Sequence, residues 1–153
     1  LSVASAAAIW KRLQSAHMTK AKAIMSADDD TLRAAGLSRQ KIRYARTLAA
    51  SGIDFTRLRQ CDDAEVISVL TEVSGIGVWT AEIYAMFSLS RPDIFAPGDL
   101  ALQEAARSLF DLPQRPKERA LRQMAEAWSP WRSVAARLLW AYYAVIKNKE
   151  GIA

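Results

Sequence analysis

The chain has 153 residues, of which 51% are hydrophobic, and this length suits one ordinary domain with its own core. Lysine and arginine number 21 against 16 acidic residues, so the net charge of +5 is compatible with a polyanionic partner without requiring one. The single cysteine, Cys61, excludes an internal disulfide and any four-cysteine zinc or iron–sulfur site, and it indicates a reducing intracellular compartment, the cytoplasm or nucleoid.

Helical periodicity recurs along the chain and strand patterns are almost absent, so the sequence predicts an all-α fold of eight or nine helices in one domain, residues 1–153. The first helix is expected from Ser2 to about Ser15. Because the chain opens inside this pattern and without methionine, we expect N-terminal sequence ahead of it. A short helix across 28–35 is predicted to end at Gly36, a residue suited to the left-handed position after a helix.

The next helix is expected between a capping Ser38 and Gly52. Its predicted apolar face consists of Ile42, Ala45, Leu48 and Ala49. Its predicted polar face is basic and comprises Arg39, Lys41, Arg43 and Arg46. Five basic residues are candidate phosphate contacts, although a solvated face explains them about as well: Lys41, Arg43, Arg46, Arg57 and Arg59.

Residues 62–88 predict two helices joined by a glycine hairpin. Asp62 and Glu65 form a capping-box pattern at the start of the first helix, and Gly75-Ile76-Gly77 separates it from a second helix that opens at Val78. Both glycines permit positive φ angles and a close backbone approach. The unpaired N–H groups of the second helix are suited to a phosphate, while an ordinary tight turn without a ligand is the alternative.

Pro97-Gly98-Asp99 is predicted to end one segment and start a helix whose apolar residues are Ala101, Leu102, Ala105 and Leu109. Pro116 is expected in the first turn of a further helix. The last helix is predicted from Trp131 to about Lys147, with an apolar stripe of Trp131, Val134, Ala135, Leu138, Tyr142 and Ile146. Trp140 and Tyr143 lie off this stripe. The longest apolar run, 138–146, is far below the roughly 18 residues that span a bilayer, so we expect no membrane association.

Asp99 is the strongest candidate for chemistry, because its position places a carboxylate at a helix N-terminus. Aspartate is also a common helix cap, and the two roles are compatible. Trp79 and Trp140 are the second candidates. Off-stripe aromatics either pack against another helix or line a cavity, and two indoles near a carboxylate suit a flat, positively charged ligand. The single histidine, His17, and the run 28–30 are assigned no catalytic or metal-binding role.

The hairpin, the aspartate that follows it and the segment Trp128-Ser129-Pro130-Trp131-Arg132-Ser133 together resemble the helix-hairpin-helix DNA glycosylase superfamily, and more narrowly its bacterial 3-methyladenine DNA glycosylase II group. The similarity extends over essentially the whole chain and is most specific from Leu70 to Leu102 and from Trp128 to Trp140. It implies a compact multi-helix glycosylase fold.

The resemblance also implies roles for individual residues. Asp99 matches the catalytic aspartate, and Trp79 and Trp140 match aromatic positions of the base pocket. Trp79 also stands where lyase-competent relatives have a catalytic lysine, which implies a monofunctional enzyme without lyase activity. A pocket tyrosine of some members falls at Ile83, and we expect neighbouring Tyr84 to compensate for it.

The remaining implications concern DNA and cations. The residues expected in the DNA-binding hairpin are Ser74, Gly75, Ile76, Gly77 and Val78. Main-chain carbonyls of Thr71, Val73 and Ile76 are expected to hold a Na⁺ or K⁺ ion that contacts a DNA phosphate, and the bond cleavage itself is expected to need no cofactor. A wedge residue of the relatives precedes the segment matching Leu1-Ser2-Val3 and falls outside this sequence.

The expected function is therefore excision of alkylated purines of the 3-methyladenine type from duplex DNA by base flipping, in base excision repair, by a monomer. A non-catalytic helix-hairpin-helix module that binds DNA structure or damage is the alternative. That module would bind DNA, release no base and be indifferent to substitution of Asp99. A helical protein-interaction domain, the third interpretation, would show no affinity for DNA.

Overall fold

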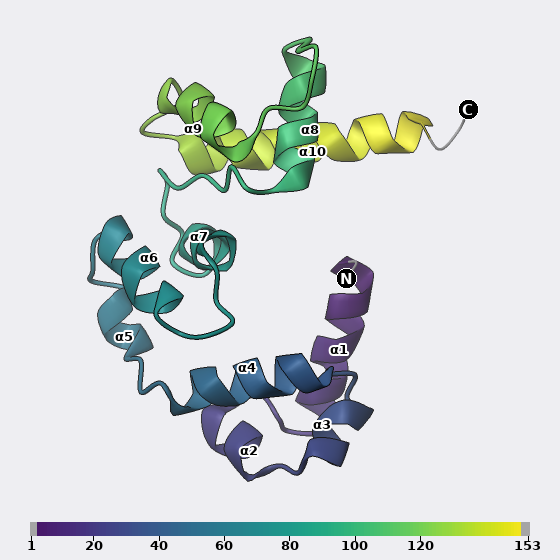
Figure 1. Cartoon of the computed structure of the whole chain (residues 1–153), viewed down its shortest axis with the longest axis vertical. Helices are drawn as coiled ribbons and strands as arrows, with labels where there is room; N and C mark the ends of the chain where they lie inside the picture. The colour runs from purple at the N-terminus through teal and green to yellow at the C-terminus, as the bar shows by residue number, and fades with distance from the viewer. Residues whose placement is uncertain (1–2, 151–153) are drawn as a thin grey trace. The chain divides into compact units, whose positions relative to one another are not determined.

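The structure, a computed structural model, describes residues 3–150 (Figure 1). Within this range it contains no strand and ten helices: α1 (Val3–Ser15), α2 (Ala21–Ser26), α3 (Asp29–Ala34), α4 (Arg39–Ala50), α5 (Phe55–Leu58), α6 (Asp63–Thr71), α7 (Val78–Phe87), α8 (Leu100–Leu109), α9 (Glu118–Glu126) and α10 (Arg132–Glu150). The all-α prediction is confirmed. The predicted eight or nine helices were too few, because α2 and α5 have only six and four residues and show no periodicity.

The predicted helix boundaries rest on caps that the structure contains. Asp28 accepts a hydrogen bond from the Thr31 N–H at 2.6 Å, and Asp62 accepts one from the Glu65 N–H at 2.8 Å. Ser38 caps α4 through the Lys41 N–H at 3.3 Å. Such side-chain acceptors satisfy N–H groups that have no partner within the helix.

Two compact units make up the chain, and each is described by itself. The first contains the chain up to Gln60 together with Val69–Ile76. In it α2 packs on α4, and the core contains Leu13, Leu32, Ala35 and Ile42. The second contains Cys61–Ser68 and the chain from Gly77 onward.

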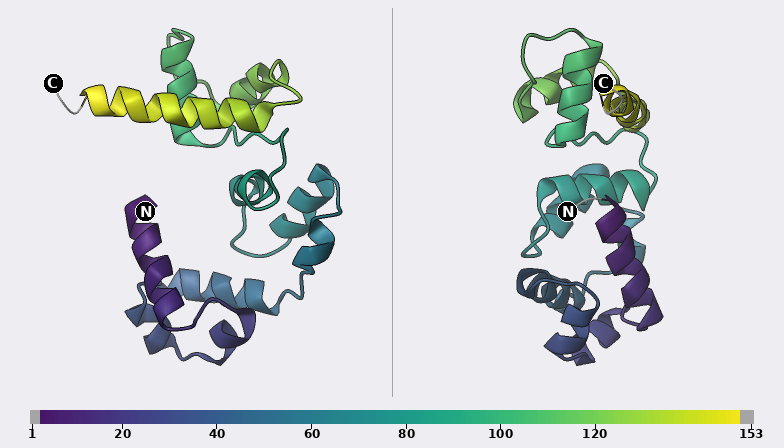
Figure 2. Two further views of the ribbon diagram at one scale, coloured as in Figure 1. Left: turned by 180° about the vertical axis from the view of Figure 1, so that it is seen from behind. Right: turned by 90° about the vertical axis from the view of Figure 1, so that its right-hand side faces the viewer.

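The second unit is built around the packing of α8 on α10, and Figure 2 shows these two helices side by side in both of its views. Its core is rich in small residues: Ala81, Ala85, Ala105, Ala106, Ala125 and Ala136, with Met86, Leu102, Leu121 and Leu139. Small side chains let helices approach closely. The candidate residues Trp79, Asp99 and Trp140 therefore come from three elements, α7, α8 and α10, of one packed unit.

The prediction for the buried face of α10 was wrong. The expected stripe is exposed at three positions, with 60% of Trp131, 46% of Val134 and 67% of Leu138 accessible. The residues buried instead are Ser133, Ala136 and Leu139. Because α10 carries apolar residues on more than one side, its periodicity alone does not show which side meets α8.

Two smaller expectations also differ from the structure. Leu109 is 50% exposed, whereas Gln103 of the same helix is buried because its Nε2 donates to the Pro97 carbonyl at 2.8 Å. Pro116 precedes Lys117, the residue at the N-cap of α9, so it lies just outside the helix instead of in its first turn.

Candidate active site

Asp99 stands at the N-terminus of α8, where a loop with buried residues 94–97 ends. Its backbone is extended, and its Oδ1 accepts hydrogen bonds from the N–H groups of Ala101 at 2.9 Å and Leu102 at 3.0 Å. The predicted capping role is thereby confirmed. These bonds hold the carboxylate at the positive end of the helix.

The same carboxylate receives both candidate tryptophans. Trp79 donates from Nε1 to Oδ2 of Asp99 at 3.0 Å, and Trp140 donates from Nε1 to Oδ1 at 3.2 Å. Asp99 is half-buried and Trp79 is 48% exposed, so the group is accessible from solvent. The structure thus brings the three strongest sequence candidates into direct contact, with the N–H edges of the indoles directed at the carboxylate.

One face of α7 runs beside this group. Trp79, Ile83 and Phe87 are spaced by four residues and share that face. The Phe87 ring lies 5.7 Å from the Trp140 ring between centroids, and the guanidinium of Arg137 lies 4.7 Å above the Phe87 ring. Phe87 was missed by the sequence reasoning, although its spacing from Trp79 was a usable signal.

The two other pocket candidates, Ile83 and Tyr84, also lie on α7. Ile83 is half-buried between Trp79 and Phe87 in helical position. Tyr84 is also half-buried but lies about 100° further around α7. A role for Tyr84 beside a bound base stays a prediction.

The segment Trp128–Ser133 binds the loop that precedes Asp99. Arg132 donates from Nε and Nη2 to the two carboxylate oxygens of Asp93, each at 2.7 Å, and Ser129 Oγ donates to Oδ2 of Asp93 at 2.8 Å. The hydrogen bond from Arg132 holds the pKa of Asp93 well below its usual range. This pair joins the loop before Asp99 to the start of α10.

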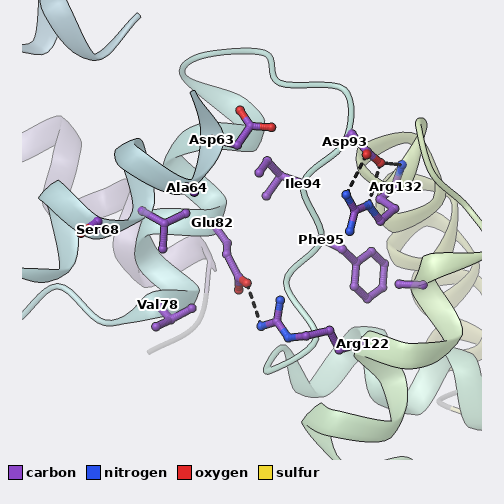
Figure 3. Close-up of a pocket in the computed structure, with 12 residues that line it drawn as sticks. Asp63, Ala64, Ser68, Val78, Glu82, Asp93, Ile94, Phe95, Arg122 and Arg132 are labelled. Carbon is purple, nitrogen blue, oxygen red and sulfur yellow. Dashed lines mark hydrogen bonds and ion pairs between the residues drawn. The ribbon is translucent and has the colours of Figure 1, made fainter. Parts of the chain in front are cut away.

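A cavity of about 540 Å³ lies along the adjoining face of α7, lined by Val78 and Glu82 among others (Figure 3). Burial raises the pKa of Glu82, while its hydrogen bond from Arg122, at 3.0 Å, opposes that shift. Figure 3 shows Glu82 and Arg122 directed at each other across the cavity. Asp99 is not among the residues that line it, so this cavity is separate from the tryptophan and aspartate group.

Of the two hairpin glycines, Gly75 has a positive φ and Gly77 does not. Gly75 has a φ of +96°, and a Cβ there would collide with the ring of Tyr44, so both its conformation and its surroundings require glycine. Gly77 has a φ of −89° and a Cβ there would meet nothing within 4 Å, so this residue does not use the positive φ that glycine permits. Gly77 instead stands at the N-cap of α7, where no side chain caps the helix.

The other hairpin candidates lie where the sequence placed them. Ser74 and Ile76 flank Gly75, and the Ile76 N–H donates to the Val73 carbonyl at 3.0 Å. Val78 is the first residue of α7 and is 47% exposed. Thr71, a candidate for cation binding, is the last residue of α6.

The expected basic face of α4 is smaller than predicted. Arg46 pairs with Asp29 at 2.7 Å and donates to the Ala27 carbonyl at 2.8 Å, so its guanidinium serves the first unit internally. Lys41 and Arg43 are exposed. They remain candidate phosphate contacts.

Two further findings apply to residues 3–150. No helix in that range combines the length and hydrophobicity needed to cross a bilayer. No cluster of three or more histidine, cysteine or acidic side chains in that range is arranged to hold a metal ion.

A sequence model of the helix-hairpin-helix (HhH-GPD) superfamily, described as base excision DNA repair proteins, matches residues 1–130. The chain belongs to the HhH-GPD superfamily. The resemblance read from the hairpin, the aspartate and the C-terminal segment is confirmed at this level.

Known HhH-GPD proteins are similar in sequence and in structure. DNA-3-methyladenine glycosylase 1 of Schizosaccharomyces pombe is 34% identical over 76% of this chain and 54% of its own length. The crystal structure of DNA-3-methyladenine glycosidase from Bacillus halodurans has a TM-score of 0.81 at 35% identity, over 97% of this chain and 71% of that one. The S. pombe enzyme Mag1 in complex with abasic DNA has a TM-score of 0.83 at 30% identity, over 92% and 72% of the two chains.

Coverage of these proteins is partial. The chain spans 44%, 54% and 58% of three curated relatives, which is about half of their length. The comparisons therefore show the family and the fold. They do not by themselves assign the activity of the whole protein.

Proposed function

We propose that this protein is a monofunctional DNA glycosylase that hydrolyses the N-glycosidic bond of alkylated purines, of the 3-methyladenine type, in duplex DNA. The observation that carries the proposal is the contact of Trp79 and Trp140 with the Asp99 carboxylate. The names of the relatives, 3-methyladenine glycosylases, support the same reaction in base excision repair.

The aromatic residues are suited to a base that carries positive charge. An alkylated purine rotated out of the duplex presents a flat cation, and an indole face attracts such a group by roughly 0.5 to 2 kcal/mol. Trp79 is 48% exposed, so part of its side chain is accessible to such a base. Stacking on tryptophan selects electron-poor bases without a detailed hydrogen-bond pattern.

The carboxylate of Asp99 supplies the charge that the reaction needs. When the bond between C1′ and the base nitrogen breaks, its electron pair leaves with the base and positive charge develops on the sugar. The ionised carboxylate stabilises that charge and accepts a proton from the water whose oxygen joins C1′. Oδ1 is held by Ala101, Leu102 and Trp140, whereas Oδ2 is held by Trp79, so Oδ2 is the oxygen assigned to sugar and water.

Absence of lyase activity is part of the proposal. A lyase step of this family begins with attack by a lysine amine, and Trp79 occupies that position. The indole N–H of Trp79 donates a hydrogen bond to Asp99, and the nitrogen has no free electron pair for attack on C1′. Water is therefore the nucleophile, and the product is an abasic site with an intact strand.

The hairpin is proposed to bind the DNA backbone. The uncapped N-terminus of α7 after Gly77 offers N–H groups to a phosphate. The carbonyls of Thr71, Val73 and Ile76 are proposed to hold a Na⁺ or K⁺ ion. The Val73 oxygen accepts a hydrogen bond from the Ile76 N–H with one lone pair, and its second lone pair can bind the cation. The working form is proposed to be a monomer in the cytoplasm or nucleoid.

The proposal is tested by release of free base from methylated duplex DNA, with strand scission at abasic sites measured separately. Asp99→Asn keeps a helix cap but removes the charge, so base release should fall by roughly a hundredfold or more while DNA affinity stays within a few-fold. Asp28→Asn is the matched control, because Asp28 is also an N-cap aspartate but belongs to the first unit. Its rate should equal that of the wild type.

Each of the other outcomes has a defined meaning. Base release by Asp99→Asn at the wild-type rate would remove Asp99 from the mechanism. DNA binding without any base release by the wild type would favour the non-catalytic module. Strand scission that accompanies base release would contradict the assignment of water as the nucleophile.

A further inference from the structure

The loop that carries Asp99 is tied to α10 at two separate places. At one end, Asp99 itself accepts the hydrogen bond from Trp140. At the other end, six residues earlier, Asp93 binds Arg132 through both carboxylate oxygens. Both ties join the same two elements, so together they fix how far the loop and the helix are shifted along each other.

The second tie is more extensive than an ion pair. The Ser133 N–H donates to the Pro92 carbonyl at 2.9 Å, and Ser133 Oγ accepts from the Ile94 N–H at 3.1 Å. The same hydroxyl lies 2.7 Å from the Arg91 carbonyl oxygen and 2.8 Å from that of Ile94. Ser133 is only 4% exposed and Ile94 is buried, so these bonds satisfy backbone groups of Ile94 that have little access to water.

We name this set of contacts the loop clamp: Asp93 with Ser129 and Arg132, and Ser133 with the backbone of residues 91–94. Figure 3 shows Arg132 directed at Asp93 at the wall of the cavity. Arg132 presents a fork of two donors that matches the two oxygens of a carboxylate, which fixes direction as well as distance.

The loop needs such a clamp because its length alone does not place Asp99. Arg132 and Trp140 are separated by eight residues of α10, or about 12 Å at 1.5 Å per residue. The chain from Asp93 to Asp99 would reach about 20 Å if extended. Since the loop is longer than the distance it bridges, chain length alone does not set the register between Asp99 and Trp140. Side-chain contacts of the loop add to the packing of α8 on α10 in setting it.

We propose that the loop clamp is a positioning device for base excision, which sets the register at which the Asp99 carboxylate meets the Trp140 indole. This inference rests on the proposed glycosylase function for its catalytic consequence. Asp93, Arg132 and Ser133 act through Asp99 and Trp140 and are positioning residues, with Arg132 about 12 Å along α10 from Trp140.

The test uses Asp93→Asn, which is nearly isosteric and removes the charge that both donors of Arg132 bind. We expect the single-turnover rate of base release from methylated duplex to fall by about tenfold to a hundredfold, because small misplacements of catalytic groups have effects of that size. The dissociation constant for duplex DNA with an abasic-site analogue should change by less than about threefold.

A second readout reports the register directly. The indole ¹H–¹⁵N signal of Trp140, assigned by its disappearance in Trp140→Phe, is sensitive to the hydrogen bond with Asp99. In Asp93→Asn this signal should move away from its wild-type position at a temperature far below unfolding. A residue that contributes only to stability would leave the signal in place.

The matched control is Glu104→Gln. Glu104 pairs with Arg107 at 2.6 Å, a contact as short as that of Asp93, but both partners lie on α8 and the pair does not tie the loop to α10. This variant should keep the wild-type rate and the wild-type Trp140 signal.

The outcomes separate the clamp from the proposed function. No base release by the wild type would refute the proposed function, while the Trp140 signal of Asp93→Asn would still decide whether the clamp sets the register. A wild-type rate together with an unmoved signal in Asp93→Asn would overturn the clamp, as would an equal loss of rate in Glu104→Gln. If Asp93→Asn does not fold, Ser129→Ala, which removes one bond to Asp93, decides in the same way.

Discussion

The two carboxylate oxygens of Asp99 have different hydrogen-bond donors. Oδ1 caps α8 through two backbone N–H groups and also accepts from Trp140, so its position is fixed by α8 and α10 together. Oδ2 has the indole of Trp79 as its hydrogen-bond donor, and that side chain is 48% exposed. A capping residue can therefore also be the proposed reacting residue, because the backbone N–H groups of the cap use one oxygen and leave the other free of them.

Two substitutions of Trp140 distinguish the contribution of its aromatic ring from that of its indole N–H group. Trp140→Phe keeps an aromatic surface but loses the donor to Oδ1, so base release should slow by roughly tenfold, equivalent to about 1.4 kcal/mol, with little change in affinity for lesion-containing duplex. Trp140→Ala should lose both rate and affinity. Single-turnover kinetics and titration with the same duplex measure the two effects, and equal rates for wild type and Trp140→Phe would exclude a role for the hydrogen bond.

At the scale of single elements, the two hairpin glycines have different reasons to be glycine. Gly75 needs a left-handed backbone and leaves room for the Tyr44 ring, whereas Gly77 has an ordinary φ and open space around it. Gly77 stands at the N-cap of α7, a position that favours glycine. The open space around it also leaves room for the close approach of DNA that we propose.

Alanine at each glycine should give opposite results. Gly75→Ala should lower the free energy of unfolding by about 1 to 3 kcal/mol, because it combines a strained φ with a collision with Tyr44. Gly77→Ala should leave unfolding unchanged and weaken DNA binding. Chemical denaturation and duplex titration of both variants check this, and undiminished DNA affinity in Gly77→Ala would contradict a close backbone approach there.

Helix α10 shows a limit of periodicity as a guide to packing. Its large apolar residues predicted one buried face, yet the buried positions are Ser133, Ala136 and Leu139. Small residues are favoured where α8 approaches closely, and Ser133 is buried because it bonds the backbone of the preceding loop. The helix was predicted correctly from the sequence, but its orientation was not.

For the chain as a whole, the described structure divides into two compact units, and the tryptophan and aspartate group lies entirely within the second. The first unit holds Gly75 and Tyr44, and the second begins again at Gly77, so the hairpin contributes residues to both. The prediction of a single domain over 1–153 is not decided by this division, because two units of this kind can belong to one folding unit.

The stability of the whole chain should depend on pH through Asp93. Its pKa in the folded state is depressed below the ordinary 3.8 by the hydrogen bond from Arg132. A depressed folded pKa stabilises the folded chain at pH above 3.8, and this contribution is lost as the pH falls below that value. The wild type should therefore exceed Asp93→Asn in unfolding free energy by a constant amount, about 1 to 3 kcal/mol, from pH 7 to about 5.

Below about pH 4 the difference in unfolding free energy between the two proteins should shrink. Protonation of Asp93 removes the negative charge from the wild type, and the substitution has already removed that charge from the variant. Denaturant unfolding at a series of pH values measures it. The depressed pKa values of Asp28 and Glu104 act equally in both proteins and cancel in the difference. A difference that stays constant down to pH 3 would show that the charge of Asp93 contributes nothing to stability.

The sequence by itself determined the longer helices, the caps at Asp28, Ser38, Asp62 and Asp99, the hairpin and the candidates for the site, because these depend on residues near each other in the chain. Only the tertiary structure decided which side of α10 is buried, that Phe87 adjoins Trp140, and that Arg46 is occupied by Asp29. It also decided the task of Arg132 and Ser133, whose partners lie 39 positions away along the chain. Contacts at that separation arise from the packing of helices, which local periodicity does not encode.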